Sequence, residues 1–255
     1  LVAMVIALAV LSGSAHAQDD VTPWTELHRV PIPEELPPHP RVFCTQADID
    51  RIRADYEAGD EYTRVAIDEL LGAARDVVSA PEPAEDHLPG RTGFHAMATL
   101  AQVYAVTGDE QFGREALERL LHAAEIAPGL ERTRAAGLFT DSTLMEGPLA
   151  VDAAWAYDLI AGERWVTDEQ RTQIEQNLLR RIGWEAGHRC GHRDSSNWRS
   201  WALVCLASCG FAAGDRDLIE EAVNGAWDPE RNTYLYGAVQ QIAHSIFADG
   251  IHWER

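Results

Sequence analysis

Short turns that join a glycine to an acidic residue recur along this chain, and they constrain its fold more than any other feature. In each turn the glycine is placed to end one helix in the left-handed conformation, and the acidic residue is placed at the start of the next helix. Successive turns lie 49, 54 and 52 residues apart. The repeat therefore predicts helical hairpins stacked side by side. The turns are residues 58–61 (AGDE), 107–110 (TGDE), 161–164 (AGER) and 213–216 (AGDR).

Helical periodicity fills the chain between these turns, so we expect an all-α fold. Thr45 and Asp48 form a variant of the capping box at the start of the first helix. The period exceeds the roughly 34 residues of tetratricopeptide units and the roughly 40 to 47 of HEAT units, which favours an (α/α) toroid over an open solenoid. The other expected helices span residues 61–78, 94–107, 110–126, 144–160, 167–182, 196–213, 215–226 and 236–248.

The two ends of the chain predict how it is divided. Residues 1–11 form an apolar run too short to cross a bilayer, and a small-residue cleavage motif follows them, so residues 1–17 are expected to be a signal peptide that lacks its basic n-region. We therefore expect a periplasmic or secreted protein. Residues 18–40 are rich in proline and are expected to be extended. Residues 41–255 are expected to form an incomplete toroid, because the sequence stops without a helix terminator.

Charge restricts the partners of this protein. The net charge of -20, from 41 acidic and 21 basic side chains, would repel nucleic acid and anionic membranes. We therefore expect no nucleic acid partner and, once the signal peptide is removed, no membrane partner. An anionic ligand would need a local group of basic side chains.

The cysteines do not predict a compact disulfide framework or a metal site. Cys205 and Cys209 are four residues apart in an apolar helix and are expected in the core. His188, Cys190 and His192 supply three possible zinc ligands, but no second pair of ligands follows at the spacing of a closed site. We expect no metal and no other cofactor.

A basic stretch stands out in this acidic chain. Residues 180–201 hold five arginines, two acidic residues and three tryptophans, a combination that suits an anionic sugar. Guanidinium groups pair with carboxylate or sulfate, and indole rings stack on sugar rings. In the alternative interpretation, Arg180 and Arg181 are the cationic last turn of one helix, and Ser195 or Ser196 caps the next.

Asn197 also allows two interpretations. It stands at the start of an apolar helix, where an asparagine commonly acts as the cap. Its amide is also placed to bind a substrate carboxylate at a helix N-terminus, where the helix dipole favours negative charge.

Four segments resemble one enzyme family. In chain order they match parts of heparinase II/III-like and alginate lyase-like polysaccharide lyases, and the resemblance runs from His39 to the last residue. The matched Asn197 segment is similar to the one that carries that family's carboxylate-neutralising asparagine. The segments are residues 39–43 (HPRVF) with the helix that follows, 154–159 (AWAYDL), 195–198 (SSNW) and 249–254 (DGIHWE).

This resemblance implies an (α/α) toroid, followed by a β-sandwich domain, that cleaves an anionic, uronic-acid polysaccharide by β-elimination. Asn197 would neutralise the uronate carboxylate, and a Tyr or His would remove the C5 proton. The expected Tyr lies beyond Arg255, and His192 and His252 are the alternatives for base or neutraliser. The residues expected to contact substrate are Arg193, Trp198, Arg199, Tyr236, Trp253 and Glu254.

Two other functions remain open from the sequence. A glycoside hydrolase on an α/α toroid would need a pair of carboxylates. A non-catalytic helical-repeat binding module would account for the hairpins but not for the basic stretch around Asn197. His95 and His244 could project inward from inner helices. The carboxylates available to a hydrolase are Asp141, Glu146, Asp152, Asp249 and Glu254.

Overall fold

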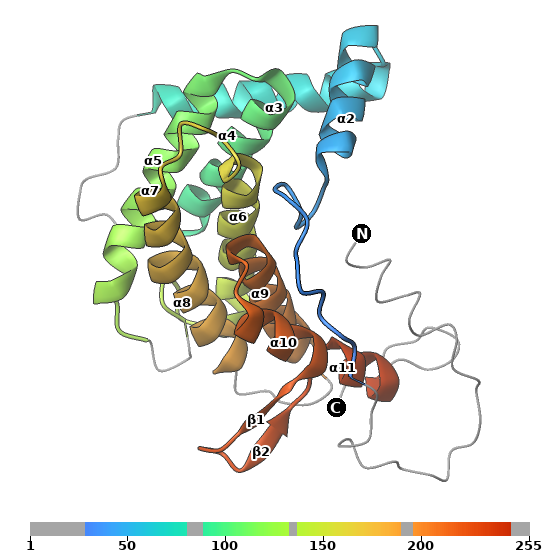
Figure 1. The fold of residues 1–255 in the computed structure, drawn as a ribbon. Coiled ribbons are helices and arrows are strands. Elements are labelled where there is room, and N and C mark those ends of the chain that lie inside the picture. The colour runs from blue at the N-terminus through green and yellow to red at the C-terminus, as the bar shows by residue number, and fades with distance from the viewer. Residues whose placement is uncertain (1–28, 81–88, 133–136, 190–195, 246–255) are drawn as a thin grey trace, which may run out of the picture.

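The computed structural model describes residues 29–80, 89–132, 137–189 and 196–245, and it is mostly helical (Figure 1). The predicted all-α class is confirmed. None of the described helices has the length and hydropathy needed to cross a membrane. The helices are α2 (Gln46–Ala58), α3 (Glu61–Ser79), α4 (Arg91–Thr107), α5 (Glu110–Ile126), α6 (Thr143–Ile160), α7 (Asp168–Gln173), α8 (Arg180–Gly183), α9 (Asn197–Ala213), α10 (Arg216–Asn224) and α11 (Ala238–Ser245), with a 3-10 turn η2 (Ala127–Gly129).

Three of the four predicted turns have the expected geometry. Gly59, Gly108 and Gly214 end their helices with φ of 81°, 73° and 67°, which a residue with a Cβ adopts only under strain. The aspartate after each glycine caps the next helix, as Asp60 does by accepting a hydrogen bond from the backbone N–H of Thr63. The capping box of Thr45 and Asp48 is also present at the start of α2.

The turn at residues 161–164 differs from the prediction. Gly162 is not among the described residues with positive φ, and the next helix begins only at Asp168, where Thr167 and Gln170 form a capping box. Arg171 closes this longer connection by donating hydrogen bonds to the carbonyl oxygens of Ala161 and Glu163.

The helix that starts at Asp168 runs on to His188, six residues past its predicted end at residue 182. It includes two π-helical segments, η3 (Ile174–Leu179) and η4 (Trp184–His188). Gly183 and Gly187 follow the predicted end of this helix, but they lie inside the helix where it packs closely on α9. A Cβ on Gly187 would lie 2.3 Å from Cγ of Leu206. These glycines therefore permit close packing rather than ending the helix.

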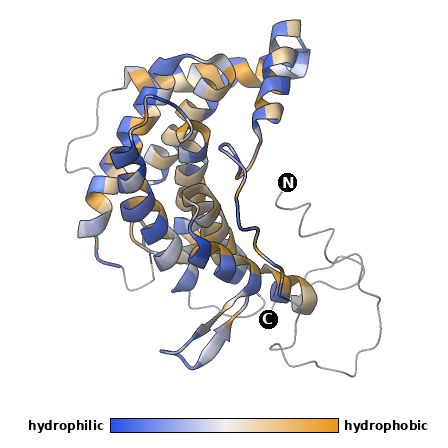
Figure 2. Cartoon of the chain, viewed as in Figure 1, coloured by the Kyte–Doolittle hydropathy of each residue, from blue (hydrophilic) through white to orange (hydrophobic). Residues whose placement is uncertain are grey.

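Three helices form the centre of the structure. α6 packs between α4 and α9, while α5 packs on α4 and α10 packs on α9. Figure 2 shows α6 and α9 largely apolar, whereas α2, α3 and α5 alternate between apolar and polar residues. This difference is expected because central helices are covered on more sides. The largest fully buried apolar side chains include Phe94, Leu149, Tyr157 and Leu178.

The central helices run in the same direction, because each hairpin joins one of them to an antiparallel partner. The N-termini of α4, α6 and α9 therefore lie at one end of the array, which we call the loop end, opposite the glycine turns. The chain leaves η2 at Gly129 and η4 at His188 at this end, and α6 and α9 begin there. Closure of the helices into a toroid stays a prediction.

A short β-hairpin replaces helix and loop near residue 230. β1 (Ala226–Asp228) pairs antiparallel with β2 (Thr233–Leu235), with Ala226 opposite Leu235. Helical periodicity predicts helix up to residue 226, whereas α10 ends at Asn224 and two strands that the sequence did not predict follow. Asp228 holds the connection together by accepting hydrogen bonds from the backbone N–H groups of Glu230 and Arg231. The hairpin projects from the lower end of the molecule in Figure 1.

Residues 29–40, the described part of the proline-rich segment, contain no helix or strand and lie along α6, α9 and α10 (Figure 1). Arg41, which directly follows this segment, donates hydrogen bonds to the carbonyl oxygens of Phe211 and Ala212 at the end of α9. Nearer the chain start, the backbone of Val30 exchanges two hydrogen bonds with the side chain of Asn224. This segment therefore covers helices that are far from it in sequence.

Candidate functional site

The candidate site is built around the N-terminus of α9. Ser196 is the N-cap, and its hydroxyl accepts a hydrogen bond of 3.1 Å from the backbone N–H of Arg199. The prediction that Ser195 or Ser196 caps this helix is thereby settled for Ser196. Asn197 is the first helical residue and is exposed, and Trp198 is half-buried. Asn197 therefore does not provide the cap.

Arg199 lies one turn into α9, and its side chain has no exposed surface. The guanidinium donates hydrogen bonds to the backbone carbonyl oxygens of Tyr236, at 2.6 Å, and Gly187, at 2.9 Å. Its Nη2 lies 3.4 Å from Oε1 of Glu221. The sequence analysis expected Arg199 to contact substrate directly. The structure instead gives it a positioning role, because it joins the start of α9 to η4, α10 and the segment before α11.

Glu221 serves as the second centre of these contacts. Its other carboxylate oxygen lies 2.6 Å from Nδ1 of His188. The imidazole of His188 in turn stacks on the indole of Trp184, with ring centroids 3.9 Å apart and planes inclined by 8°. The side chains of Arg199 and Glu221 are both buried. A buried carboxylate of this kind requires its partners, because an unpaired one is costly.

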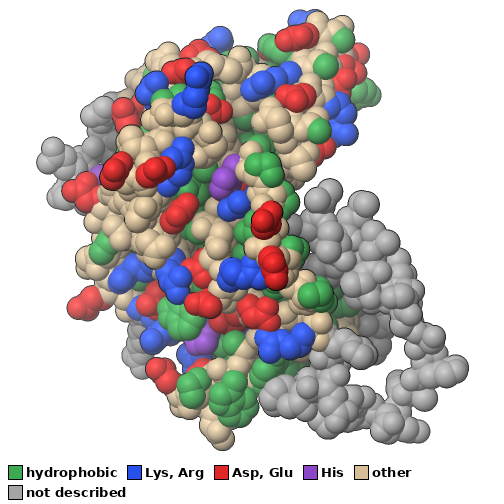
Figure 3. Space-filling view, in the orientation of Figure 1, with side chains coloured by type: hydrophobic (Ala, Val, Ile, Leu, Met, Phe, Trp, Pro, Cys, Tyr) green, Lys and Arg blue, Asp and Glu red, His purple; other side chains and the backbone are tan. Residues whose placement is uncertain are grey.

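The basic stretch does not form one patch in space. Arg180 forms ion pairs with Asp215 and Asp217 on α10, and Arg199 pairs with Glu221. Both arginines therefore join neighbouring helices. The alternative interpretation placed Arg180 and Arg181 in the last turn of a helix, and α8 does end at Gly183, but the helix continues through η4 to His188. Figure 3 likewise shows acidic and basic side chains interspersed over the visible face.

Asn197 belongs to an exposed row of side chains along α9. Trp201 and Val204 follow it at helical spacing and are 37% and 38% exposed. Trp201 reaches across to α6, where a Cβ on Gly147 would lie 2.9 Å from its ring. Exposed tryptophan beside an exposed amide suits a sugar, whose ring stacks on indole while its polar groups accept hydrogen bonds.

A histidine and an aspartate face each other on the neighbouring central helices. His95 of α4 is 73% exposed, and its Nδ1 lies 3.7 Å from Oδ2 of Asp152 on α6. Burial raises the pKa of the Asp152 carboxyl, against the opposing effects of His95 and Arg91. His95 is therefore exposed to solvent beside a partly buried Asp152, and its projection into the interior of a toroid stays a prediction.

Glu146 was a candidate carboxylate for hydrolysis, but it is fully buried. It accepts hydrogen bonds from the backbone N–H groups of Leu138, Phe139 and Thr140 at 2.9 to 3.0 Å, and also from the Thr140 hydroxyl. Burial raises the pKa of the Glu146 carboxyl, which these hydrogen bonds oppose. Glu146 therefore fixes the connection before α6 and is not accessible to a substrate.

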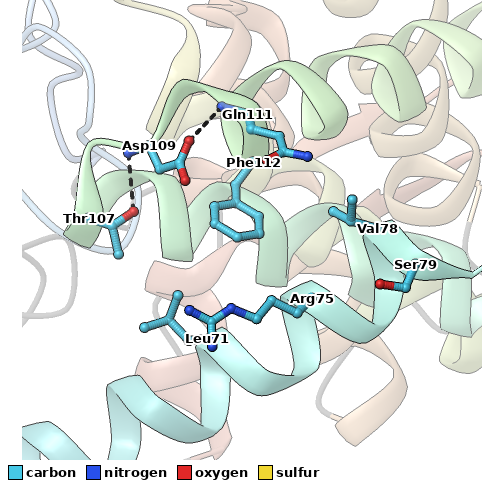
Figure 4. A pocket seen from close by; sticks show the side chains of 8 residues that line it. All are labelled: Leu71, Arg75, Val78, Ser79, Thr107, Asp109, Gln111 and Phe112. Atoms are coloured by element: carbon cyan, nitrogen blue, oxygen red, sulfur yellow. Dashed lines mark hydrogen bonds between the residues drawn. The ribbon is translucent and has the colours of Figure 1, made fainter.

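A cavity of about 420 Å³ lies elsewhere, between α3 and the turn that joins α4 to α5 (Figure 4). Thr107, Asp109 and Gln111 form one side of it through hydrogen bonds within the turn. Arg75 and Phe112 extend toward it from the facing helices. None of the predicted site residues lines this cavity, and it lies at the end of the array opposite Asn197.

Comparison with known proteins gives two distant relatives. An exo-oligoalginate lyase of Saccharophagus degradans is 23% identical over 232 residues, which cover 85% of this chain and 31% of that protein. An alginate lyase of Stenotrophomonas maltophilia is 22% identical over 203 residues, covering 75% of this chain and 26% of that protein. The chain is similar to alginate lyases. No model of a known protein family matches it.

The similarity to alginate lyases covers a limited part of those proteins. The chain spans less than a third of the length of these two relatives. Several predicted site residues lie outside the described part of the chain, and their roles stay predictions. They are His192, Arg193, His252, Trp253 and Glu254.

Sequence reasoning missed the polar contacts behind the site. Glu221 received no role, although it is the residue that pairs with both His188 and Arg199. Gln241 of α11 also went unnoticed, and its side-chain amide donates to the carbonyl oxygen of Ser196 at 3.2 Å. One signal was available for Glu221. It is an acidic residue on the apolar side of the amphipathic helix α10, where a charged side chain needs a partner.

Proposed function

We propose that this chain is the helical part of a polysaccharide lyase that cleaves a uronic-acid polysaccharide of the alginate class by β-elimination. The observation that carries the proposal is the position of Asn197, exposed at the first turn of α9 beside Trp201, with Ser196 acting as the cap. The similarity to two alginate lyases supports the same reaction and an anionic polysaccharide as substrate.

The reaction begins with removal of the weakly acidic proton at C5 of a uronate. Donation of hydrogen bonds from the Asn197 amide to the uronate carboxylate would stabilise the enolate-like intermediate that forms. A helix N-terminus adds to this effect, because its partial positive charge favours an anion. The indole of Trp201 would hold the sugar ring beside the amide.

A base and an acid complete the elimination. A Tyr or His removes the C5 proton, and an acid protonates the glycosidic oxygen at C4 as its bond breaks. His192 and His252 remain our candidates within this chain, and Trp198, Arg193, Tyr236, Trp253 and Glu254 remain proposed contacts of the polysaccharide. Arg199 is proposed as a positioning residue, which holds the N-terminus of α9 in place through hydrogen bonds to the backbone carbonyl oxygens of Tyr236 and Gly187.

The alternative of glycoside hydrolysis has less support. It requires two accessible carboxylates flanking the glycosidic bond. Glu146 is fully buried and accepts hydrogen bonds from backbone N–H groups, so it is not available as one of these two carboxylates. Asp152 is 19% exposed, and its partner among the described residues is His95, while Asp249 and Glu254 lie outside the described part of the chain.

Architecture and location form part of the proposal. We infer that the helices belong to an (α/α) toroid of the heparinase II/III-like kind and that the protein is exported to the periplasm or secreted. The stacked hairpins and the parallel central helices support the toroid. The apolar run and cleavage motif of residues 1–17 support export.

An ultraviolet assay tests the proposed reaction. Elimination creates a C4–C5 double bond that absorbs in the ultraviolet, whereas hydrolysis creates only a new reducing end. The purified protein is incubated with alginates and other polyuronates, and both signals are recorded. We expect the absorbance to rise when alginate is the substrate. This rise should be lost in Asn197→Ala and kept in the control Asn177→Ala, which changes a half-buried residue of η3. New reducing ends without absorbance would refute elimination.

A further inference from the structure

Four arginines from three separate parts of the chain gather at the loop end. Arg132 follows η2, Arg181 lies in α8, Arg189 follows η4, and Arg231 lies between β1 and β2. Nη2 of Arg132 and Nη2 of Arg231 lie 3.5 and 3.3 Å from the same acceptor, the carbonyl oxygen of Arg189. Arg181 donates a hydrogen bond of 2.6 Å to the carbonyl oxygen of Leu130, two residues before Arg132. We call these four residues the arginine cluster.

The cluster has an excess of positive charge. Asp228 pairs with Arg231 at 2.9 Å, and Glu185 lies 3.8 Å from Nε of Arg189, which is too long for a hydrogen bond. Among the ion pairs between described residues, these two are the ones that involve the cluster, so four guanidinium groups have two carboxylate partners at this range in a chain whose net charge is -20. Like charges repel one another, so a cluster of this kind is favourable only when an anion can offset it.

The cluster also includes N–H donors that lack a hydrogen-bond partner among the described residues. Nε of Arg132 and Nε of Arg181 are buried and have no hydrogen-bond partner among the residues that the structure describes. The side chains of Arg189 and Arg231 are 38% and 24% exposed, so solvent and solutes reach the group. Each guanidinium carries five N–H donors, and carboxylates bind such donors in pairs.

The cluster adjoins the proposed active site. Arg199, in the first turn of α9 behind Asn197, donates its Nη1 hydrogen bond to the carbonyl oxygen of Gly187, two residues before Arg189. Asn197 and the arginine cluster therefore lie at the same end of the helical array, where a longer polysaccharide bound at Asn197 would extend toward the cluster.

We propose that Arg132, Arg189 and Arg231 form a second carboxylate-binding subsite, which holds a uronate of the same polysaccharide other than the one at Asn197. The choice of ligand rests on the proposed function, while the anion-binding chemistry rests on the cluster alone. A subsite of this kind gives longer oligosaccharides an affinity that short ones lack, because only a longer ligand spans both positions.

Calorimetry with alginate oligosaccharides tests this subsite. The probes are an alginate hexasaccharide, an alginate disaccharide and a neutral cello-oligosaccharide of six sugars, and Asn197→Ala is the background so that no cleavage occurs. We expect Arg132→Gln with Arg189→Gln to weaken hexasaccharide binding about tenfold or more, because each change removes a charge-assisted contact. The disaccharide should bind unchanged, and the matched control Arg64→Gln, an exposed residue of α3, should bind the hexasaccharide normally.

Unchanged binding of the hexasaccharide by the folded double variant would overturn the subsite and leave the arginines with a structural role. Should the double variant unfold, Arg189→Gln alone provides the same comparison, because its side chain is 38% exposed and its Nε lies 3.8 Å from Glu185, beyond hydrogen-bond distance. These results are separable from the reaction itself. Absence of elimination on every polyuronate would refute the proposed function, whereas the loss of hexasaccharide binding in the variant would still support the subsite.

Discussion

The carboxylate of Asp158 accepts a hydrogen bond of 2.8 Å from the backbone N–H of Arg41, although 117 residues separate the two. The same oxygen accepts a second hydrogen bond from Val42, and the other oxygen lies 2.6 Å from Nδ1 of His39. Two of the four segments that carry the resemblance to polysaccharide lyases are therefore in contact. That part of the resemblance marks a structural junction between the proline-rich segment and α6.

Replacing Asp158 by Ala should detach this junction. The change leaves two partly buried N–H groups without an acceptor, and we expect a loss of about 2 to 4 kcal/mol in the free energy of unfolding. Limited proteolysis should then cut the chain before α2 sooner than in the wild type. The exposed Asp76 is the matched control, and Asp76→Ala should change neither measurement.

Removing Arg199 should be more damaging than removing an exposed arginine. Arg199→Met leaves Glu221 buried beside fewer partners, which costs about 3 to 5 kcal/mol in urea unfolding. The double change Arg199→Met with Glu221→Leu should recover much of this loss, because no unpaired charge remains. Equal stability of the single and double variants would contradict a coupled pair.

The cap and the proposed catalytic amide can be separated on α9. Ser196→Ala should cost about 1 kcal/mol of stability, because the N–H of Arg199 loses its acceptor. Asn197→Ala should change stability by less than this and should abolish elimination. Thermal unfolding and the ultraviolet assay on both variants check the separation. Loss of activity only in Ser196→Ala would assign the effect to helix capping.

Glu146 should be essential to folding at the loop end. In Glu146→Ala the backbone N–H groups of residues 138–140 lose their acceptor, and we expect a destabilisation of about 3 kcal/mol or more in urea. Asp141→Ala, an exposed neighbour, should stay within about 0.5 kcal/mol of the wild type. A small effect of the Glu146 change would mean that water replaces the carboxylate.

Alkaline pH should weaken the packing of α4. Burial, together with a hydrogen bond to Glu163, raises the pKa of Tyr104 to about 12. The unfolded chain loses this proton near its ordinary pKa of about 10, so the stabilisation is complete below that pH and declines as the pH rises toward 12. Urea unfolding at successive pH values should therefore show a smaller alkaline loss in Tyr104→Phe than in wild type. Tyr62→Phe, at an exposed position, should follow the wild type.

The sequence predicts the features that depend on residues near one another. The capping box at Thr45, the glycines at 59, 108 and 214 and the helix from residue 110 to 126 all occur as expected, because local hydrogen bonds determine them. The exposed position of Asn197 was likewise among the possibilities that the sequence left open.

Other features depend on contacts between distant residues and could not be predicted. Gly187 permits close packing against Leu206, and nothing in its own segment distinguishes this role from helix termination. Similarly, Arg231 joins Arg189 only through the β-hairpin, so the basic stretch and the arginine cluster share only two residues. Pairing of Arg199 with Glu221 is invisible until α9 and α10 are packed.

The glycine turns place unequal constraints on how this chain can change during evolution. Only two residues separate the helices at Gly59, Gly108 and Gly214, and one inserted residue would rotate the following helix by about 100° and displace its apolar side from the core. Insertions of the same size in the connection at residues 127–142 would leave both flanking helices in register. Length changes should therefore accumulate beside Asn197 and the arginine cluster, so that related chains can acquire new ligand preferences while keeping the same helical core.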